Sequence, residues 1–193
     1  MTARLLSRLA ARAELRRAAA MLHPECPIEQ TVRGRSAPVQ AQLLQEIWRR
    51  HSFIADGALL VAEPGCLRVL ARTERALDAP VGALRQRYGG DVVVEPASVR
   101  YAHGAPVLEP FMNVLVTGPA RHLPYVQSDL GQRRGAMTRV DQRAGVFVIE
   151  AEAPLGHLLG YGDRLDERFE GSVEASLWLS RYCPIAGGGP YVA

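Results

Sequence analysis

The stretch LEPFMNVLVTGP, residues 108–119, decides the fold of this chain. Its middle part, Phe111–Thr117, alternates between two sets of apolar side chains, which is the pattern of a β-strand with one face in a core. The first set is Met112, Val114 and Val116, and the second is Phe111 and Leu115. Gly118-Pro119 then favours a turn. The segment therefore predicts one long strand that the rest of the domain is built around.

A helix is expected after this strand. Residues recur at helical spacing at Leu123, Val126, Gln127 and Leu130. Gly135 stands where a left-handed C-cap residue would end such a helix. Arg133 and Arg134 precede it, and their charges suit the negative end of the helix dipole.

The remaining pattern predicts two more strands, a second helix and a last strand. The predicted elements are a strand at 137–140, a turn at 143–145, a strand at 146–152, a helix and a strand at 173–179. Pro154 suits the first turn of this helix, which Leu155, Leu158, Leu159 and Leu165 would line. The order is β-α-β-β-α-β, a ferredoxin-like split unit.

The first half of the chain can be read in the same order, from Ile28 to Tyr101. The predicted elements are a strand at 28–33, a helix capped by Ser36, strands at 53–61 and 66–71, a helix ending at Tyr88 and a strand at 92–94. Pro80 is unfavourable inside a helix, so the second helix is expected to begin at an Asp78 N-cap or to be kinked.

The predicted fold class is therefore α+β, with two tandem ferredoxin-like modules and a preceding helix. The predicted parts are a basic N-terminal helix at 1–27, a first module at 28–101, a linker at 102–107, a second module at 108–188 and a tail at 189–193. In the helix, Arg4, Arg8, Arg12 and Arg16 recur every four residues. Several interpretations of this row stay open: a basic ridge for RNA or an acidic partner, a solvated helix face, the degenerate remnant of an upstream domain, or a mitochondrial presequence.

Several motifs of the second module resemble the fifth, C-terminal domain of elongation factor G and related translational GTPases. They are Glu109-Pro110-Phe111-Met112, Asp129-Leu130, Arg133-Arg134-Gly135, Glu152-Ala153-Pro154-Leu155, Gly160-Tyr161 and Arg181-Tyr182. The first module resembles, less strongly, the third domain of the same factors. It does so at Glu74, Leu77, Leu84, Arg85, Tyr88, Gly89, Glu95-Pro96 and Val99-Arg100-Tyr101. It departs from that pattern at residues 72–75, where glycines are expected.

The family's other domains have no counterpart here. Only residues 102–107 separate the two modules, where elongation factor G has a whole fourth domain, and no GTPase pattern occurs. All 23 basic residues are arginine. A chain without lysine cannot build the lysine-containing phosphate loop or form a lysine Schiff base. These observations predict a protein that is not an enzyme and needs no cofactor.

Cysteine content favours a cytoplasmic protein, and the charge is only mildly basic. The net charge is +3 and the pI is near 9.0, which permits contact with nucleic acid without requiring it. The three cysteines, Cys26, Cys66 and Cys183, are widely spaced, as reduced thiols of a cytosolic protein are. His23 and Cys26 have the spacing of half a metal site, but no second pair completes it, so no metal site is predicted.

Arg133, Arg134, Arg139 and Arg143 are the candidates for contact with phosphate, because guanidinium groups bind phosphate oxygens in pairs. The resemblance implies that this module touches ribosomal RNA and protein near the stalk base. The alternative for the arginines is a solvated surface. Tyr161 is either a stacking platform for a base or a core residue, and Trp178 is out of phase with its neighbours and is expected on the opposite sheet face.

The resulting hypothesis is a non-catalytic, translation-related protein. It would bind the ribosome, through the large subunit, or a translation factor, and would occupy its site by charge and shape alone. An alternative is a small-molecule-sensing module that holds a ligand between the two ferredoxin-like units. A third is a decayed fragment that folds and has no partner.

Overall fold

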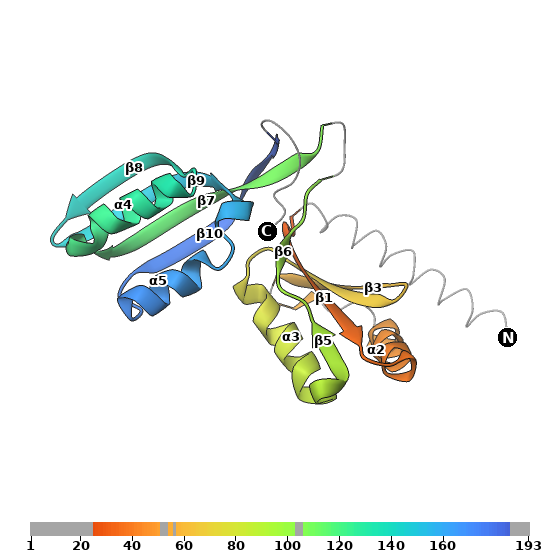
Figure 1. Ribbon diagram of the computed structural model, residues 1–193. Helices are drawn as coiled ribbons and strands as arrows, with labels where there is room; N and C mark the ends of the chain where they lie inside the picture. Colours follow the sequence, from red (N-terminus) through yellow and green to blue (C-terminus); the bar gives the residue numbers. More distant parts are fainter. Residues whose placement is uncertain (1–24, 51–53, 56, 103–105, 186–193) are drawn as a thin grey trace. The chain divides into compact units, whose positions relative to one another are not determined.

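The structure is a computed structural model, and it describes residues 25–50, 54–55, 57–102 and 106–185 (Figure 1). It divides into two compact units, Met1–Ser98 and Val99–Ala193. Residues 1–24 of the predicted N-terminal helix, the histidine of the half metal site and the predicted tail lie outside the described residues, and residues 25–27 are not helical. No helix among the described residues is both long and apolar enough to cross a membrane.

The first unit is built on an antiparallel sheet with two helices. Its elements are β1 (Ile28–Gly34), α2 (Ala37–Arg50), β2 (Ile54–Ala55), β3 (Ala58–Glu63), β4 (Cys66–Ala71), α3 (Arg75–Tyr88), η1 (Gly89–Asp91), β5 (Val92–Val94) and β6 (Ser98–Val99). The strand order is β2-β3-β4-β1-β5, and β6 also pairs with β1. The predicted order of strands and helices is therefore present, with α2 beginning directly after Ser36.

Two details of the first unit differ from the prediction. The strand predicted at 53–61 is divided into β2 and β3 by Gly57, whose φ of 87° reverses the chain between them. Helix α3 begins at Arg75 and contains Pro80, so Asp78 is not its N-cap. The proline costs one backbone hydrogen bond near the helix start, and burial of Leu77, Val81 and Leu84 on the sheet side offsets that loss.

The junction between β1 and α2 depends on a glycine. A Cβ atom on Gly34 would lie 2.5 Å from the backbone nitrogen of Gln40, which is closer than real side chains approach backbone atoms. The Gly34 N–H also donates to Oε1 of Gln40 at 2.6 Å. The strand can therefore turn directly into the helix only because this position has no side chain.

The second unit has a four-stranded sheet, and its described residues form no counterparts of the additional strands β2 and β6. Its elements are β7 (Leu108–Pro119), η2 (Ala120–His122), α4 (Leu123–Gln132), β8 (Ala136–Arg143), β9 (Val146–Pro154), η3 (Leu155–His157), α5 (Tyr161–Phe169) and β10 (Glu174–Pro184). The strand order is β10-β7-β9-β8, and all neighbours are antiparallel. Both helices lie on one face of this sheet (Figure 1).

The core of the second unit lies between this sheet and its two helices. Alternate side chains of β7 point into this core. Met112, Val114 and Val116 are buried, as the pattern of the central strand predicts. The helices contribute Val126, Leu130, Tyr161 and Leu165. Trp178 pairs with Asn113 in the register of β10 with β7, and both side chains belong to the opposite face, where Trp178 is exposed. The predicted orientation of Trp178 is therefore confirmed.

The end of α4 corrects one prediction about its cap. The left-handed residue is Arg134, with a φ of 59°, and not Gly135. The N–H of Gly135 donates to the Leu130 carbonyl at 2.8 Å and that of Arg134 to the Gly131 carbonyl at 3.1 Å, which together form a Schellman motif. Gly135 is required for space instead, because a Cβ atom there would lie 2.8 Å from the Leu130 carbonyl oxygen.

The start of α5 corrects another prediction. Pro154 is the last residue of β9, with extended backbone angles, and pairs with Phe111 of β7. A short 3-10 turn follows, and α5 begins only at Tyr161, after a left-handed Gly160. Strand pairing therefore overrides the local preference of proline for a helix start. The predicted leucines at 155, 158 and 165 are nevertheless buried.

Candidate nucleic-acid interface

Arg133, one of the predicted phosphate ligands, is engaged inside the second unit. Its Nε donates to Oδ2 of Asp129 at 2.8 Å and its Nη2 to Oδ1 at 3.3 Å. Its Nη1 donates to the His157 carbonyl at 3.0 Å, and its guanidinium carbon lies 5.0 Å from the centre of the Tyr161 ring. Only 21% of the side chain is exposed. Arg133 thus ties the end of α4 to the turn before α5.

Tyr161 is fully buried, with 0% of its surface exposed. A ring in this position cannot stack on a base, so the prediction that Tyr161 contacts nucleic acid is wrong, and its alternative, core packing, holds. Burial and the nearby carboxylate of Asp129 raise the pKa of the hydroxyl well above its ordinary value. The hydroxyl oxygen is buried and has no hydrogen-bond partner among the described residues.

Arg134 is exposed and lies close enough to Glu109 for their charges to interact. Glu109 is only 6% exposed, and its Oε2 atom has no hydrogen-bond partner in the described part of the chain. Burial raises the pKa of the Glu109 carboxyl, and the charge of Arg134 opposes part of that rise. Arg134 therefore compensates a buried carboxylate of the same unit, while its backbone caps α4.

Replacing Glu109 with glutamine should stabilise the second unit at neutral pH by about 1 kcal/mol. A carboxyl whose folded pKa exceeds its ordinary value of 4.5 binds its proton more tightly in the folded state. The free energy of unfolding therefore falls as the pH rises from 4.5 through the folded pKa. Above the folded pKa, the whole cost of burying the charged carboxylate applies. Urea unfolding of both proteins between acidic and neutral pH measures this.

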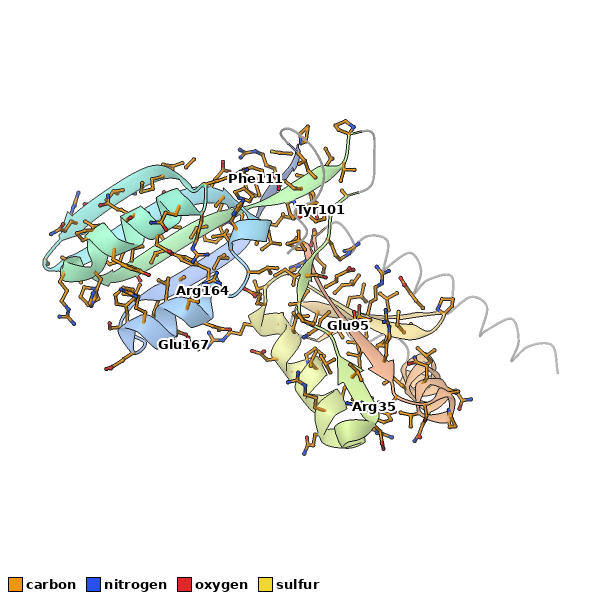
Figure 2. The ribbon with its side chains drawn as sticks, in the orientation of Figure 1. Arg35, Glu95, Tyr101, Phe111, Arg164 and Glu167 are labelled. Atoms are coloured by element: carbon orange, nitrogen blue, oxygen red, sulfur yellow. The ribbon has the colours of Figure 1, made fainter. Side chains whose placement is uncertain are left out.

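The glutamine variant should lose its advantage at acid pH, where wild-type Glu109 is protonated. Glu167→Gln is the matched control, because Glu167 is an exposed carboxylate of α5 (Figure 2). A Glu109 variant that is less stable than wild type at neutral pH would show that Arg134 compensates the buried charge fully.

Arg139 and Arg143 lie on the open face of the sheet, the face without helices, and form a row of ion pairs. Arg139 contacts Asp141 at 3.3 Å and Glu150 at 3.6 Å, and Arg143 contacts Asp141 at 3.2 Å. The Arg143 side chain is 84% exposed. Such exposed pairs contribute about 0–1 kcal/mol each, so a phosphate can replace the carboxylate at little cost. These two arginines stay candidates for phosphate contact.

The second unit has another basic surface, which the sequence pattern does not predict. We call Arg121, His122, Tyr125, Arg168 and Phe169 the aromatic-arginine cluster. The rings of His122 and Phe169 lie 4.4 Å apart, and Tyr125 meets Phe169 edge-on at 5.4 Å. The Arg168 guanidinium lies 3.9 Å from the centre of the Tyr125 ring. At the other end, Arg121 Nε donates to Nε2 of His122 at 3.0 Å.

The cluster contains two cations that have no acidic partner in the described part of the chain. Neither Arg121 nor Arg168 forms an ion pair with a carboxylate of the described residues. Arg121 also precedes α4, so it faces the positive end of that helix dipole, where an anion would be favoured. The Tyr125 ring is exposed, whereas the rings of His122 and Phe169 are half-buried. Aromatic rings beside guanidinium groups are typical of sites that bind nucleic acid.

The sequence gives little signal of this cluster, because its two halves come from η2–α4 and from the end of α5. Only the packing of both helices on one sheet face brings them together. No group of three or more His, Cys, Asp or Glu side chains that could hold a metal ion gathers within the described residues.

Comparison with known proteins identifies the second unit. Residues 106–188 match the family described as elongation factor G C-terminus. Over 79 residues the chain is 40% identical to elongation factor G of Cytophaga hutchinsonii. That segment covers 41% of this chain and 11% of the relative, so the chain matches a small part of the longer protein. This chain therefore carries, at residues 106–188, an elongation factor G-like C-terminal domain, which confirms the resemblance that its motifs indicate.

Proposed function

We propose that this protein is a non-catalytic, translation-related protein of the cytoplasm that binds the ribosome, through the large subunit, or a translation factor. The observation that carries the proposal is the match of residues 106–188 to the C-terminus of elongation factor G. The matched segment contains no GTPase domain, and the chain contains no lysine with which to build the usual phosphate loop.

The mechanism is electrostatic and steric. Arg139 and Arg143 on the open sheet face, with Arg121 and Arg168 of the aromatic-arginine cluster, supply the cations that contact phosphate. The rings of that cluster supply a stacking surface for an unpaired base. Because each neutralised phosphate releases counterions, the binding weakens steeply as salt rises.

The proposal includes the fold class of both units. In the second unit the order of elements is β-α-β-β-α-β, and the strand order β10-β7-β9-β8 corresponds to 4-1-3-2, as in ferredoxin-like domains. In the first unit β5, β1, β4 and β3 have the same arrangement, and β2 and β6 are additional strands. We assign both units to that class. The first unit is taken to correspond to the third domain of elongation factor G, on the residues given above, with a linker at 102–107.

The test is co-sedimentation of the full chain with ribosomes and separated subunits, at low and moderate salt. Two charge-reversal variants report on the two surfaces: Arg139→Glu/Arg143→Glu and Arg121→Glu/Arg168→Glu. Arg75→Glu/Arg85→Glu is the matched control, since both residues are exposed on α3 of the first unit and the charge change is equal. Arg133 is left unchanged because it holds the fold of the second unit.

Wild type and control should pellet with the large subunit at low salt, and at least one of the two second-unit variants should remain in the supernatant. If both variants bind as the control does, neither surface is the ribosome contact. If wild type itself pellets at neither salt concentration, the ribosome-binding form of the proposed function is wrong. A thermal-shift screen for small ligands then tests the sensing alternative.

A further inference from the structure

Strand β8 has an unused edge. It lies at the end of the four-stranded sheet and pairs with β9 alone among the described residues. Its eight residues contain no proline, and an irregularity of register lies between Met137 and Arg139. From Arg139 to Arg143 the strand is regular and carries charges of both signs, which oppose pairing only with a partner whose charges do not match. Val140 and Met137 add exposed apolar surface there, and Val140 is 42% exposed. This edge is open to pairing with another strand.

The hairpin between β8 and β9 fixes which backbone groups point outward. Ala144 and Gly145 have φ values of 49° and 79°, typical of a two-residue type I′ turn. In such a hairpin the flanking pair, Arg143 and Val146, is hydrogen-bonded, and bonded pairs then alternate along the ladder. Val140 and Ile149 form a non-hydrogen-bonded pair of this ladder. Its N–H and C=O therefore point to the free edge.

The side chains around Val140 are self-complementary in charge. Arg139 and Asp141 flank it and share the open face of the sheet. When two β8 strands pair antiparallel about Val140, each Arg139 lies opposite Asp141 of the other strand. These positions form non-hydrogen-bonded pairs, in which the side chains approach most closely.

We propose that two copies of this chain associate through β8, with Val140 of one copy paired with Val140 of the other. The contact is two-fold symmetric, because the same edge serves both copies, and it joins two four-stranded sheets into one of eight strands. Val140 contributes apolar contact at the axis, and the two Arg139–Asp141 pairs fix the register. The inference is independent of the proposed function.

The first experiment measures the mass of the purified full chain by sedimentation velocity over a concentration series. The expected result is a mass that rises from 21.1 kDa toward twice that value. Val140→Pro should stay monomeric while keeping a wild-type circular dichroism spectrum, because it removes an N–H directed away from β9. A wild-type chain that remains monomeric at every concentration would overturn the proposal.

Charge exchange tests the register. Arg139→Asp alone and Asp141→Arg alone each place like charges opposite one another, so each variant should dimerise at least tenfold more weakly. Mixing the two variants should restore association as a heterodimer, and the double exchange should restore the homodimer. Glu174→Arg, on the opposite edge strand β10, is the matched control and should dimerise as wild type. The register about Val140 would be refuted if the two single variants dimerised as wild type does, or if a mixture of them failed to associate.

Discussion

Replacing Arg133 with alanine should lower the free energy of unfolding of the second unit by about 2–3 kcal/mol. The Asp129 carboxylate is only 16% exposed and would lose both of its guanidinium hydrogen bonds. The His157 carbonyl would lose its donor and Tyr161 its cation contact. Each loss leaves a group inside the unit without the partner that compensates its burial.

Urea unfolding followed by circular dichroism measures this change, with Arg143→Ala as the control. The Arg143 side chain is exposed and, within the described residues, pairs with Asp141 alone, so its removal should change the free energy of unfolding by less than about 0.5 kcal/mol. If both variants lost the same free energy of unfolding, Arg133 would not stabilise the interior of the unit more than the exposed Arg143 does. The comparison also shows whether a ribosome-binding defect of an Arg133 variant reflects binding or folding.

The order of elements in the second unit follows from the sequence because its signals are local. The alternation through Phe111–Thr117 describes a strand buried on one face, and the spacing around Val126 and Leu130 describes a helix. The structure contains both. These residues lie where local preference and core packing favour the same conformation.

The errors occur where local preference and tertiary structure disagree. Pro154 suits a helix start, but its pairing with Phe111 keeps it in β9. A glycine normally takes the left-handed position after a helix, but here Arg134 takes it, since the next residue has no room for a Cβ atom. Both outcomes depend on contacts with segments that a local pattern does not include.

The candidate interface was predictable only as a list of residue types. Sequence identifies the arginines, but it cannot show that Arg133 is engaged by Asp129 whereas Arg143 is exposed. Nor does it bring Arg121 to the same surface as Arg168, because they come from separate segments. Composition thus predicts which groups can contact phosphate, and the packing of α4 and α5 decides which of them are available.

Replacing Tyr161 with alanine should cost the second unit about 3–5 kcal/mol, the largest loss expected among these variants. The ring is fully buried, so its removal leaves a cavity between α5, Arg133 and the sheet. Tyr161→Phe should unfold within about 1 kcal/mol of wild type, or be more stable. It keeps the ring and removes a buried hydroxyl that has no hydrogen-bond partner among the described residues.

The two Tyr161 variants separate a core role from a role in binding. Tyr161→Phe should pellet with ribosomes as wild type does, whereas Tyr161→Ala should pellet less, in proportion to the fraction of its second unit that is unfolded. Tyr125→Ala is the comparison, since Tyr125 is an exposed ring held between Arg168 and Phe169. It should unfold within about 1 kcal/mol of wild type and still bind ribosomes more weakly. If folded Tyr161→Phe binds ribosomes more weakly than wild type, the Tyr161 hydroxyl belongs to the interface. If Tyr125→Ala binds as wild type does, the aromatic rings of the cluster do not contribute to binding.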